Sequence, residues 1–294
     1  LVSEVPRCES VTVMLENLRS PADLKALPVS DLPALAEEIR ELIVKVINVN
    51  GGHMASNLGV VELTIALHRV FNSPTDTLVF DVSHQSYVHK ILTGRRPDFE
   101  RIRTTGGYSG YFDKDESPHD ILTLGHAGSA PSLALGLAIA EKLAEQQGYT
   151  VCVIGDGGLT SGVAYEGLSN IVAQKPCNLM VILNDNGMAI SPNVGWLANW
   201  RGRWLPRLRD KLELDQDFQS FERLTESLAP KVPLGPFFLD LGKGIKSTLQ
   251  TSLIPEVGRV WDELGFNYLG PVDGHNIAEL ITVLTRAREH SAKP

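Results

Sequence analysis

The sequence has 294 residues, of which 43% are hydrophobic, and its formal net charge is −8 at pH 7. This length and apolar content predict a globular protein with the core of one large or two small α/β domains. The acidic balance, without a dense Lys/Arg cluster, argues against nucleic acid as a partner.

The first half of the chain begins with two helical patterns. Apolar residues at helical spacing over 31–48 predict an amphipathic helix that Asp31 caps and that ends at the glycines 51–52. The same pattern predicts a second helix over 57–71. The apolar run 77–82 has strand length and leads into polar, His-bearing sequence, where functional residues often lie.

The clearest pattern lies between residues 132 and 183. It predicts a helix over 132–145, a strand over 150–154, a helix over 163–172 and a strand over 179–183. Such a crossover makes the two strands parallel, so their carboxyl ends open on one edge of the sheet, where α/β proteins bind ligands. We therefore predict an α/β fold with a mostly parallel sheet and helices on both faces.

The last third of the chain is less regular. Residues 192–254 are richer in Pro, Gly and Trp, and we interpret them as a poorly ordered or helical insertion with a helix over 218–229. Order returns with 256–264 and with a helix over 277–289. Between them, Asp273 and His275 are expected to organise a turn.

Cysteine usage and the ends of the chain bear on its location. Cys8, Cys152 and Cys177 lie far apart, which is typical of a reducing compartment, and we predict a cytoplasmic protein. No long apolar run or signal peptide is present, so we expect no membrane association. The chain starts at Leu1 and stops directly after a helical pattern, which we interpret as a processed or excerpted polypeptide.

Polar loops follow both strands of the crossover. Residues 155–158 read Gly-Asp-Gly-Gly, and residues 184–186 read Asn-Asp-Asn. Asp and Asn oxygens suit a small divalent cation, and glycines beside Asp156 let main-chain N–H groups approach phosphate oxygens. Either loop alone reads as an ordinary turn. Together they favour magnesium bridging a diphosphate, whereas the Walker loop and the dinucleotide fingerprint are both missing.

The spacing of these loops resembles that of a known motif. Gly-Asp-Gly, then 28 residues, then Asn186 is similar to the motif of thiamine diphosphate enzymes such as transketolases and decarboxylases. Further segments resemble the 1-deoxy-D-xylulose-5-phosphate synthase family: GGHMASNLGVVELT (51–64), DVSHQSY (81–87), HKILTGRR (89–96), NDNGMAIS (184–191), LGFNY (264–268) and GPVDGH (270–275). The resemblance extends from Asp23 to Glu289 and is weakest over 201–253.

The resemblance implies a role for particular residues. Magnesium would be held by Asp156, Asn186 and the main-chain oxygen of Met188. Thiamine diphosphate would be contacted by His84, Gly125, His126, Ala127, Gly157, Gly158 and Asn186. His53 and His84 would be catalytic, through proton transfer and substrate contacts, because imidazole titrates near neutral pH. His68, His119 and His290 lie outside the matched segments and are expected to be solvated or packing residues.

The resemblance also implies an activity and a domain organisation. Residues 1–22 would form an N-terminal extension and 23–294 a thiamine diphosphate-binding domain that holds the diphosphate and magnesium. The pyrimidine-binding and C-terminal domains are absent from this chain, so we expect it to be inactive alone. The complete transferase would be a homodimer that decarboxylates pyruvate and condenses it with glyceraldehyde 3-phosphate to 1-deoxy-D-xylulose 5-phosphate, for isoprenoid and thiamine synthesis.

Some positions depart from the family's usual wording. Ser83 stands in place of Gly, Val88 in place of Pro, 111–113 in place of a Phe-Pro-Lys-like segment, and 128–130 in place of hydroxyl residues. Two alternatives therefore stay open. The chain could be one subunit of a split transketolase-like enzyme, or a non-catalytic paralogue that keeps the fold as a binding or interaction protein.

Overall fold

The computed structural model describes residues 14–174, 178–185, 261 and 264–291. The chain divides into two compact units, Leu1–Asn186 with Pro271–Pro294, and Gly187–Gly270. The sheet and every site residue placed below belong to the first unit. The predicted insertion at 192–254, with its helix over 218–229, lies outside the described residues.

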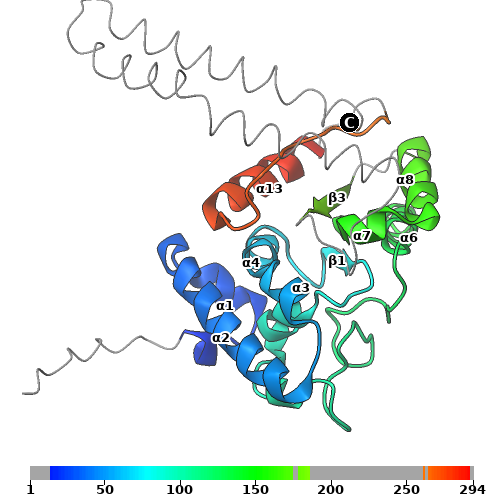
Figure 1. The fold of residues 1–294 in the computed structure, drawn as a ribbon. Coiled ribbons are helices and arrows are strands. Elements are labelled where there is room, and N and C mark those ends of the chain that lie inside the picture. The colour runs from blue at the N-terminus through cyan, green and yellow to red at the C-terminus, as the bar shows by residue number, and fades with distance from the viewer. Residues whose placement is uncertain (1–13, 175–177, 186–260, 262–263, 292–294) are drawn as a thin grey trace, which may run out of the picture. The chain divides into compact units, whose positions relative to one another are not determined.

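The first unit consists of helices around a small sheet (Figure 1). The helices are α1 (Pro21–Ala26), α2 (Leu32–Asn50), α3 (Met54–Leu58), α4 (Val61–Val70), α5 (Tyr87–Lys90), α6 (Ala130–Leu143), α7 (Asp156–Leu159), α8 (Gly162–Gln174) and α13 (Ile277–Ser291). Short helical turns are η1 (Leu15–Asn17), η2 (Val29–Asp31), η3 (Ile91–Arg95) and η4 (Phe99–Arg101). The strands are β1 (Thr77–Phe80), β2 (Thr150–Gly155) and β3 (Leu179–Asn184). From residue 130 onward, the predicted elements that the structure describes are confirmed to within two residues.

The sheet is parallel throughout the described residues. Its strand order is β1-β2-β3, and the register pairs Thr77 with Thr150 and Gly155 with Asn184. The carboxyl ends of all three strands therefore meet at one edge, as the sequence predicts.

Helices cover both faces of this sheet, because side chains of alternate residues point to opposite faces. Leu78 and Val151 belong to a core cluster with α4 and α13, whereas Val79 and Cys152 pack against α6. In Figure 1, α6 and α8 lie on one side of the strands and α4 and α13 on the other. The predicted α/β architecture with two covered faces is confirmed.

A second core lies between α2 and the segments around it. The apolar stripe of α2, which includes Leu35, Ile39 and Ile43, is buried, and Leu15 joins the same cluster. Each such side chain contributes about 1.5–3 kcal/mol when it is fully buried. The Glu38 carboxylate accepts the N–H groups of residues 14 and 15. Leu15, which lies in the expected N-terminal extension 1–22, is thus part of this core.

Two predictions for this half of the chain are wrong in detail. The predicted helix over 57–71 is split, because Val60 has a non-helical ψ of 16° and α4 begins only at Val61. The Asn57 side chain bonds to main-chain oxygens rather than facing solvent, which favours a break there. Asp31 makes no capping hydrogen bond to α2, since its carboxylate accepts from Ser30. The end of α2 at Gly51, with φ of +69°, is as predicted.

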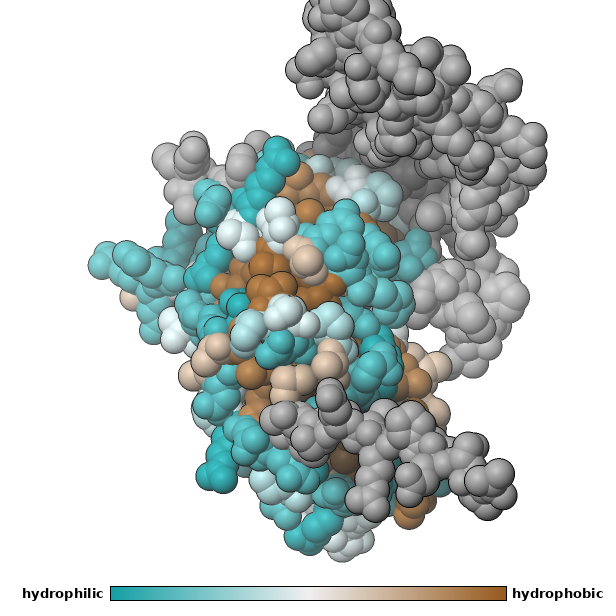
Figure 2. Space-filling model, turned by 90° about the vertical axis from the view of Figure 1, so that its left-hand side faces the viewer, coloured by the Kyte–Doolittle hydropathy of each residue, from teal (hydrophilic) through white to brown (hydrophobic). Residues whose placement is uncertain are grey.

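The surface is mostly polar on the face seen in Figure 2, where hydrophobic residues gather in a central area that hydrophilic ones surround. None of the described helices is long and apolar enough to cross a membrane.

Candidate active site

The loop after β1 is fixed to the start of α6 by Asp81. This carboxylate is 4% exposed and accepts the N–H groups of Gly128 at 2.8 Å and Ala130 at 3.1 Å. Its own N–H donates to Val153 on β2 at 2.7 Å. Asp81 therefore orients the turn 125–127, which precedes α6. Asp81 had no predicted role, although a carboxylate directly after a buried strand was a signal for one.

Two glycines let the loops at this edge approach each other. A Cβ on Gly158 would lie 2.4 Å from Oδ2 of Asp81, and one on Gly128 would lie 1.9 Å from Oγ of Ser161. Gly128 also has a φ of +79°, which favours glycine. The departure from hydroxyl residues at this position thus has a local reason. The loops after β1 and β2 and before α6 interlock at main-chain distance.

The predicted magnesium site is described in part. Asp156 starts α7 directly after β2 and is 4% exposed. Asn184 ends β3 beside Gly155. Asn186 and Met188, the other predicted ligands, lie outside the described residues. Within the described ranges no group of three His, Cys, Asp or Glu side chains could hold a metal ion. Of the predicted ligand set, the structure places only Asp156.

The predicted diphosphate contacts fit an anionic group. Gly125, His126 and Ala127 are exposed just before α6, and a Cβ on Gly125 would meet nothing within 4 Å. The first N–H groups of a 14-residue helix such as α6 carry partial positive charge and attract anions. Gly157 and Gly158, which are partly exposed, follow Asp156 in α7. The local chemistry therefore suits phosphate oxygens.

His53 and His84 lie together, as the resemblance implies for two residues of one site. Their ring centroids are 5.4 Å apart in an edge-on arrangement. The fully buried Asn57 donates to the main-chain oxygens of His53 at 2.7 Å and His84 at 2.8 Å, and it accepts the Tyr87 N–H at 2.9 Å. One amide thus sets the spacing of both histidines. Sequence analysis quoted Asn57 in a family segment but gave it no role.

Both histidines are held in the neutral form. Burial lowers the pKa of His53, and the charge of Arg103 lowers it further. Burial and then His53 lower the pKa of His84, and Asp81 only partly offsets this. Nδ1 of His84 is buried and has no hydrogen-bond partner among the described residues. Neutral imidazoles can accept a proton near pH 7, and His84 has an atom available for a bound group.

Three further side chains surround His53. The Tyr87 hydroxyl lies 3.5 Å from its Nδ1, and the Tyr111 ring centroid lies 5.5 Å from the His53 ring centroid. A Cβ on Gly52, which has a φ of +143°, would meet the Tyr87 hydroxyl at 2.7 Å and Cδ of Arg103 at 3.3 Å. These residues were missed, because segments far apart in the sequence supply them.

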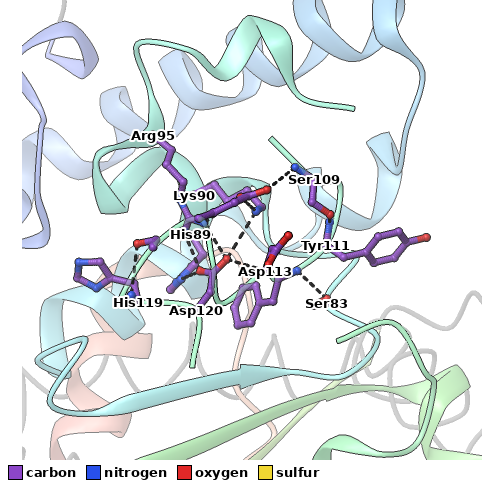
Figure 3. A network of polar contacts seen from close by, with 12 residues as sticks. Ser83, His89, Lys90, Arg95, Ser109, Tyr111, Asp113, His119 and Asp120 are labelled. Carbon is purple, nitrogen blue, oxygen red and sulfur yellow. Dashed lines mark hydrogen bonds and ion pairs between the residues drawn. The ribbon is translucent and has the colours of Figure 1, made fainter. Parts of the chain in front are cut away.

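A buried polar network lies behind the Tyr111 loop (Figure 3). Arg95 donates two hydrogen bonds of 2.7 Å to Asp120, His89 contacts the same carboxylate at 3.1 Å, and Lys90 pairs with Glu116. Hydrogen bonds from Arg95 and His89 hold the pKa of Asp120 well below its ordinary value, although burial alone would raise it. The buried Asp120 and the partly buried Glu116 thus compensate the two buried bases Lys90 and Arg95.

The network also includes two of the histidines that were expected to be solvated or packing residues. His68 is fully buried and bonds to His89 at 3.0 Å, so it is a packing residue rather than a solvated one. His119 is half-buried and bonds to Ser73 at 2.8 Å. The side chain of His290 is outside the described residues.

The turn at 273–275 forms as predicted, because Asp273 accepts the N–H of His275 at 2.9 Å. The His275 ring also contacts Glu62 at 3.1 Å, and Arg40 pairs with the same Glu62 carboxylate. These residues line a cavity of about 390 Å³ beside the start of α2 and α13.

The chain is similar in sequence to known enzymes. The chain is 45% identical over 281 residues to the 1-deoxy-D-xylulose-5-phosphate synthase of Dehalococcoides mccartyi, covering 96% of this chain and 43% of that enzyme. It is 50% identical over 272 residues to that of Thermomicrobium roseum, covering 91% and 41%. The chain thus spans less than half the length of the curated relatives it matches.

A solved structure shares the fold, and a family model matches the sequence. Transketolase from Campylobacter jejuni superposes with a TM-score of 0.60 at 19% identity, over 90% of this chain and 37% of that one, which shows a shared fold. The family model for 1-deoxy-D-xylulose-5-phosphate synthase, N-terminal portion, matches residues 15–294. The chain therefore belongs to the 1-deoxy-D-xylulose-5-phosphate synthase family.

Proposed function

We propose that this chain is the diphosphate- and magnesium-binding portion of a transferase that joins pyruvate, with loss of carbon dioxide, to glyceraldehyde 3-phosphate. The product is 1-deoxy-D-xylulose 5-phosphate. The observation that carries the proposal is the convergence at one sheet edge of the Gly155–Gly158 loop, the Asp81-held turn before α6 and the loop that leads to His84. Membership of the family supports this activity for the longer protein.

The cofactor contacts in this proposal are made by the loops at the sheet edge. Asp156 contributes a carboxylate oxygen to magnesium, together with Asn186 and the main-chain oxygen of Met188. Main-chain N–H groups at 125–127 and 157–158 bind the diphosphate oxygens, and His84 lines the same site. When bound, thiamine diphosphate supplies a nucleophilic thiazolium carbon and accepts the electrons released as carbon dioxide leaves.

The proton steps fall to the histidine pair. Because their lowered pKa values keep His53 and His84 neutral at pH 7, either can take a proton from a substrate hydroxyl and return it. Arg103, whose charge acts on His53, is the cation that we assign to the phosphate of the aldehyde substrate. Tyr87 orients His53 through its hydroxyl.

The proposal includes a second portion of protein. Ylide formation needs a Glu that contacts the aminopyrimidine ring, and a pyrimidine-binding domain, in cis or as a separate subunit, would supply it. We propose that the complete enzyme is a cytoplasmic homodimer, to which the apolar area in Figure 2 offers a contact surface, and that the isolated chain has no turnover.

Calorimetric titration of thiamine diphosphate, with and without magnesium, tests the site. We expect magnesium-dependent binding that tightens when the missing portion is supplied. Asp156→Ala should weaken it by about 10- to 100-fold, since a ligand is lost but no core packing. Asp98→Ala, at an exposed position without a side-chain cap, is the matched control.

Three outcomes would change the proposal. Unchanged affinity in Asp156→Ala would overturn the metal assignment. If thiamine diphosphate binds neither to the chain alone nor to the chain with the missing portion supplied, the non-catalytic paralogue would be favoured. Turnover of a ketose phosphate instead of pyruvate by the complete assembly would favour the split transketolase-like enzyme.

A further inference from the structure

The loop 109–113 is held from several directions at once. The N–H of Ser109 donates to Glu116, that of Phe112 to Oγ of Ser83 at 2.9 Å, and that of Asp113 to Oδ2 of Asp120 at 3.1 Å. The accepting side chains belong either to the buried network or to the loop after β1. The main chain on both sides of residue 111 is therefore fixed.

Within this fixed loop, adjacent side chains point in different directions. Phe112 is 1% exposed and packs on His89, with ring centroids 4.8 Å apart. Tyr111 is only half-buried, and Figure 3 shows its ring pointing away from the network. Its ring lies edge-on to His53, and its hydroxyl makes no hydrogen bond to any described residue. The loop thus presents one phenol at the candidate site, with a hydroxyl that no described residue binds.

The loop that provides the Ser83 contact is strained. Val82 and Ser83 have φ values of +61° and +64°, which non-glycine residues rarely adopt and which cost on the order of 1–3 kcal/mol each. The Ser83 hydroxyl donates to the Val82 oxygen at 2.6 Å while it accepts from Phe112. These two bonds offset part of the strain and tie it to the position of Tyr111.

We propose that Tyr111 determines which substrate is accepted beside His53, and that Ser83, Glu116 and Asp120 are its positioning residues. The phenol hydroxyl pairs with a hydroxyl or phosphate oxygen of a small phosphorylated aldehyde. Pyruvate carries neither of these groups. Gly110 allows this approach, because a Cβ there would lie 3.1 Å from Cγ of Arg103. Tyr111 and Arg103 thus face one substrate from adjacent positions. This assignment rests on the proposed function.

Steady-state kinetics of the complete assembly test this assignment. Tyr111→Phe should raise the KM for glyceraldehyde 3-phosphate by about tenfold, because the loss of one hydrogen bond to a bound polar group weakens binding by about this factor. The KM for pyruvate and the affinity for thiamine diphosphate should not change. Tyr108→Phe, directly before this loop and packed against the α2 core, is the matched control.

The positioning role has a test of its own. Ser83→Ala and Ser83→Gly both remove the hydroxyl, but only glycine relieves the positive φ. Equal rises of the aldehyde KM in both variants would support positioning through Oγ. A rise in Ser83→Ala alone would assign the effect to backbone strain and overturn the role of Ser83.

The outcomes for Tyr111 separate it from the proposed function. An active wild type whose Tyr111→Phe variant keeps its aldehyde KM would overturn the specificity role alone. A wild-type assembly without turnover of pyruvate and glyceraldehyde 3-phosphate would overturn the proposed function and this assignment with it.

Discussion

The two sides of the candidate site are built by opposite means. On one side, formed by the loops 125–128 and 155–158, the main chain comes close because side chains are missing, as at Gly128 and Gly158. On the other side, formed by the loops 81–87 and 109–113, side-chain oxygens hold the main chain, and a buried network supports them. We refer to these as the glycine side and the network side.

The difference separates loops that meet through their main chains from loops that side chains support. The glycine side depends on the register of the sheet and on the close approach of main chains, since Gly158 faces Asp81 and Gly128 faces Ser161. The network side depends on pairs such as Arg95 with Asp120 and Ser83 with Phe112, which are separated by 25 and 29 positions. We expect mutations on the network side mainly to lower the free energy of unfolding. Mutations on the glycine side should mainly disturb the close approach of the loops that bind the cofactor.

The largest effect is expected for Asp120→Ala on the network side. Removing this carboxylate leaves Arg95 and Lys90 buried without part of their compensating charge, which should cost about 3–5 kcal/mol of unfolding free energy. Urea denaturation of the chain measures this cost. Asp115→Ala, at an exposed position on the neighbouring turn, should change stability by less than about 0.5 kcal/mol. Equal effects of the two substitutions would remove the network from its supporting role.

A smaller effect is expected for Gly158→Ala on the glycine side. The new Cβ would contact Oδ2 of Asp81, which two main-chain hydrogen bonds hold in place, so we expect a loss of about 1–3 kcal/mol. Magnesium-dependent thiamine diphosphate binding should weaken in parallel. Gly162→Ala, with open space around it at the start of α8, should be neutral or slightly stabilising. A neutral result for Gly158→Ala would mean that the loops can separate without loss.

The pH dependence of stability sharpens the comparison further. Burial keeps the pKa of His89 at about 4 and that of His68 well below 6.5. Between about pH 6.5 and pH 4, the unfolded chain binds protons that the folded chain does not, so stability should fall as the pH falls. His68→Gln keeps a hydrogen-bonding group but does not titrate. It should reduce the slope of unfolding free energy by up to about 1.4 kcal/mol per pH unit. An unchanged slope would show that His68 takes up a proton in the folded state.

The distinction between local patterns and long-range contacts explains which features were predictable from the sequence. Period and turn residues are local, so the strands, α6, α8 and α13 were predicted well, whereas the short helix α7 over Asp156–Leu159 was not predicted. The break before Val61 was missed because it follows from the contacts that Asn57 makes with His84, 27 positions away. Asp81, Tyr87 and Arg103 escaped assignment for the same reason. The roles of His53 and His84 came from the resemblance, and their contact shows only in three dimensions.

The packing of α13 on α4 also constrains how the protein is made. Leu280 and Leu284 complete the core above β1 and β2, and Arg288 donates to the oxygen of Val70, 218 positions earlier. During synthesis, the apolar face of α4 that packs on α13 therefore stays exposed until residues 187–270 and then α13 have been translated. A ribosome-bound chain that ends before Ile277 carries an unfinished core, which makes this interval the time at which a chaperone has a surface to bind.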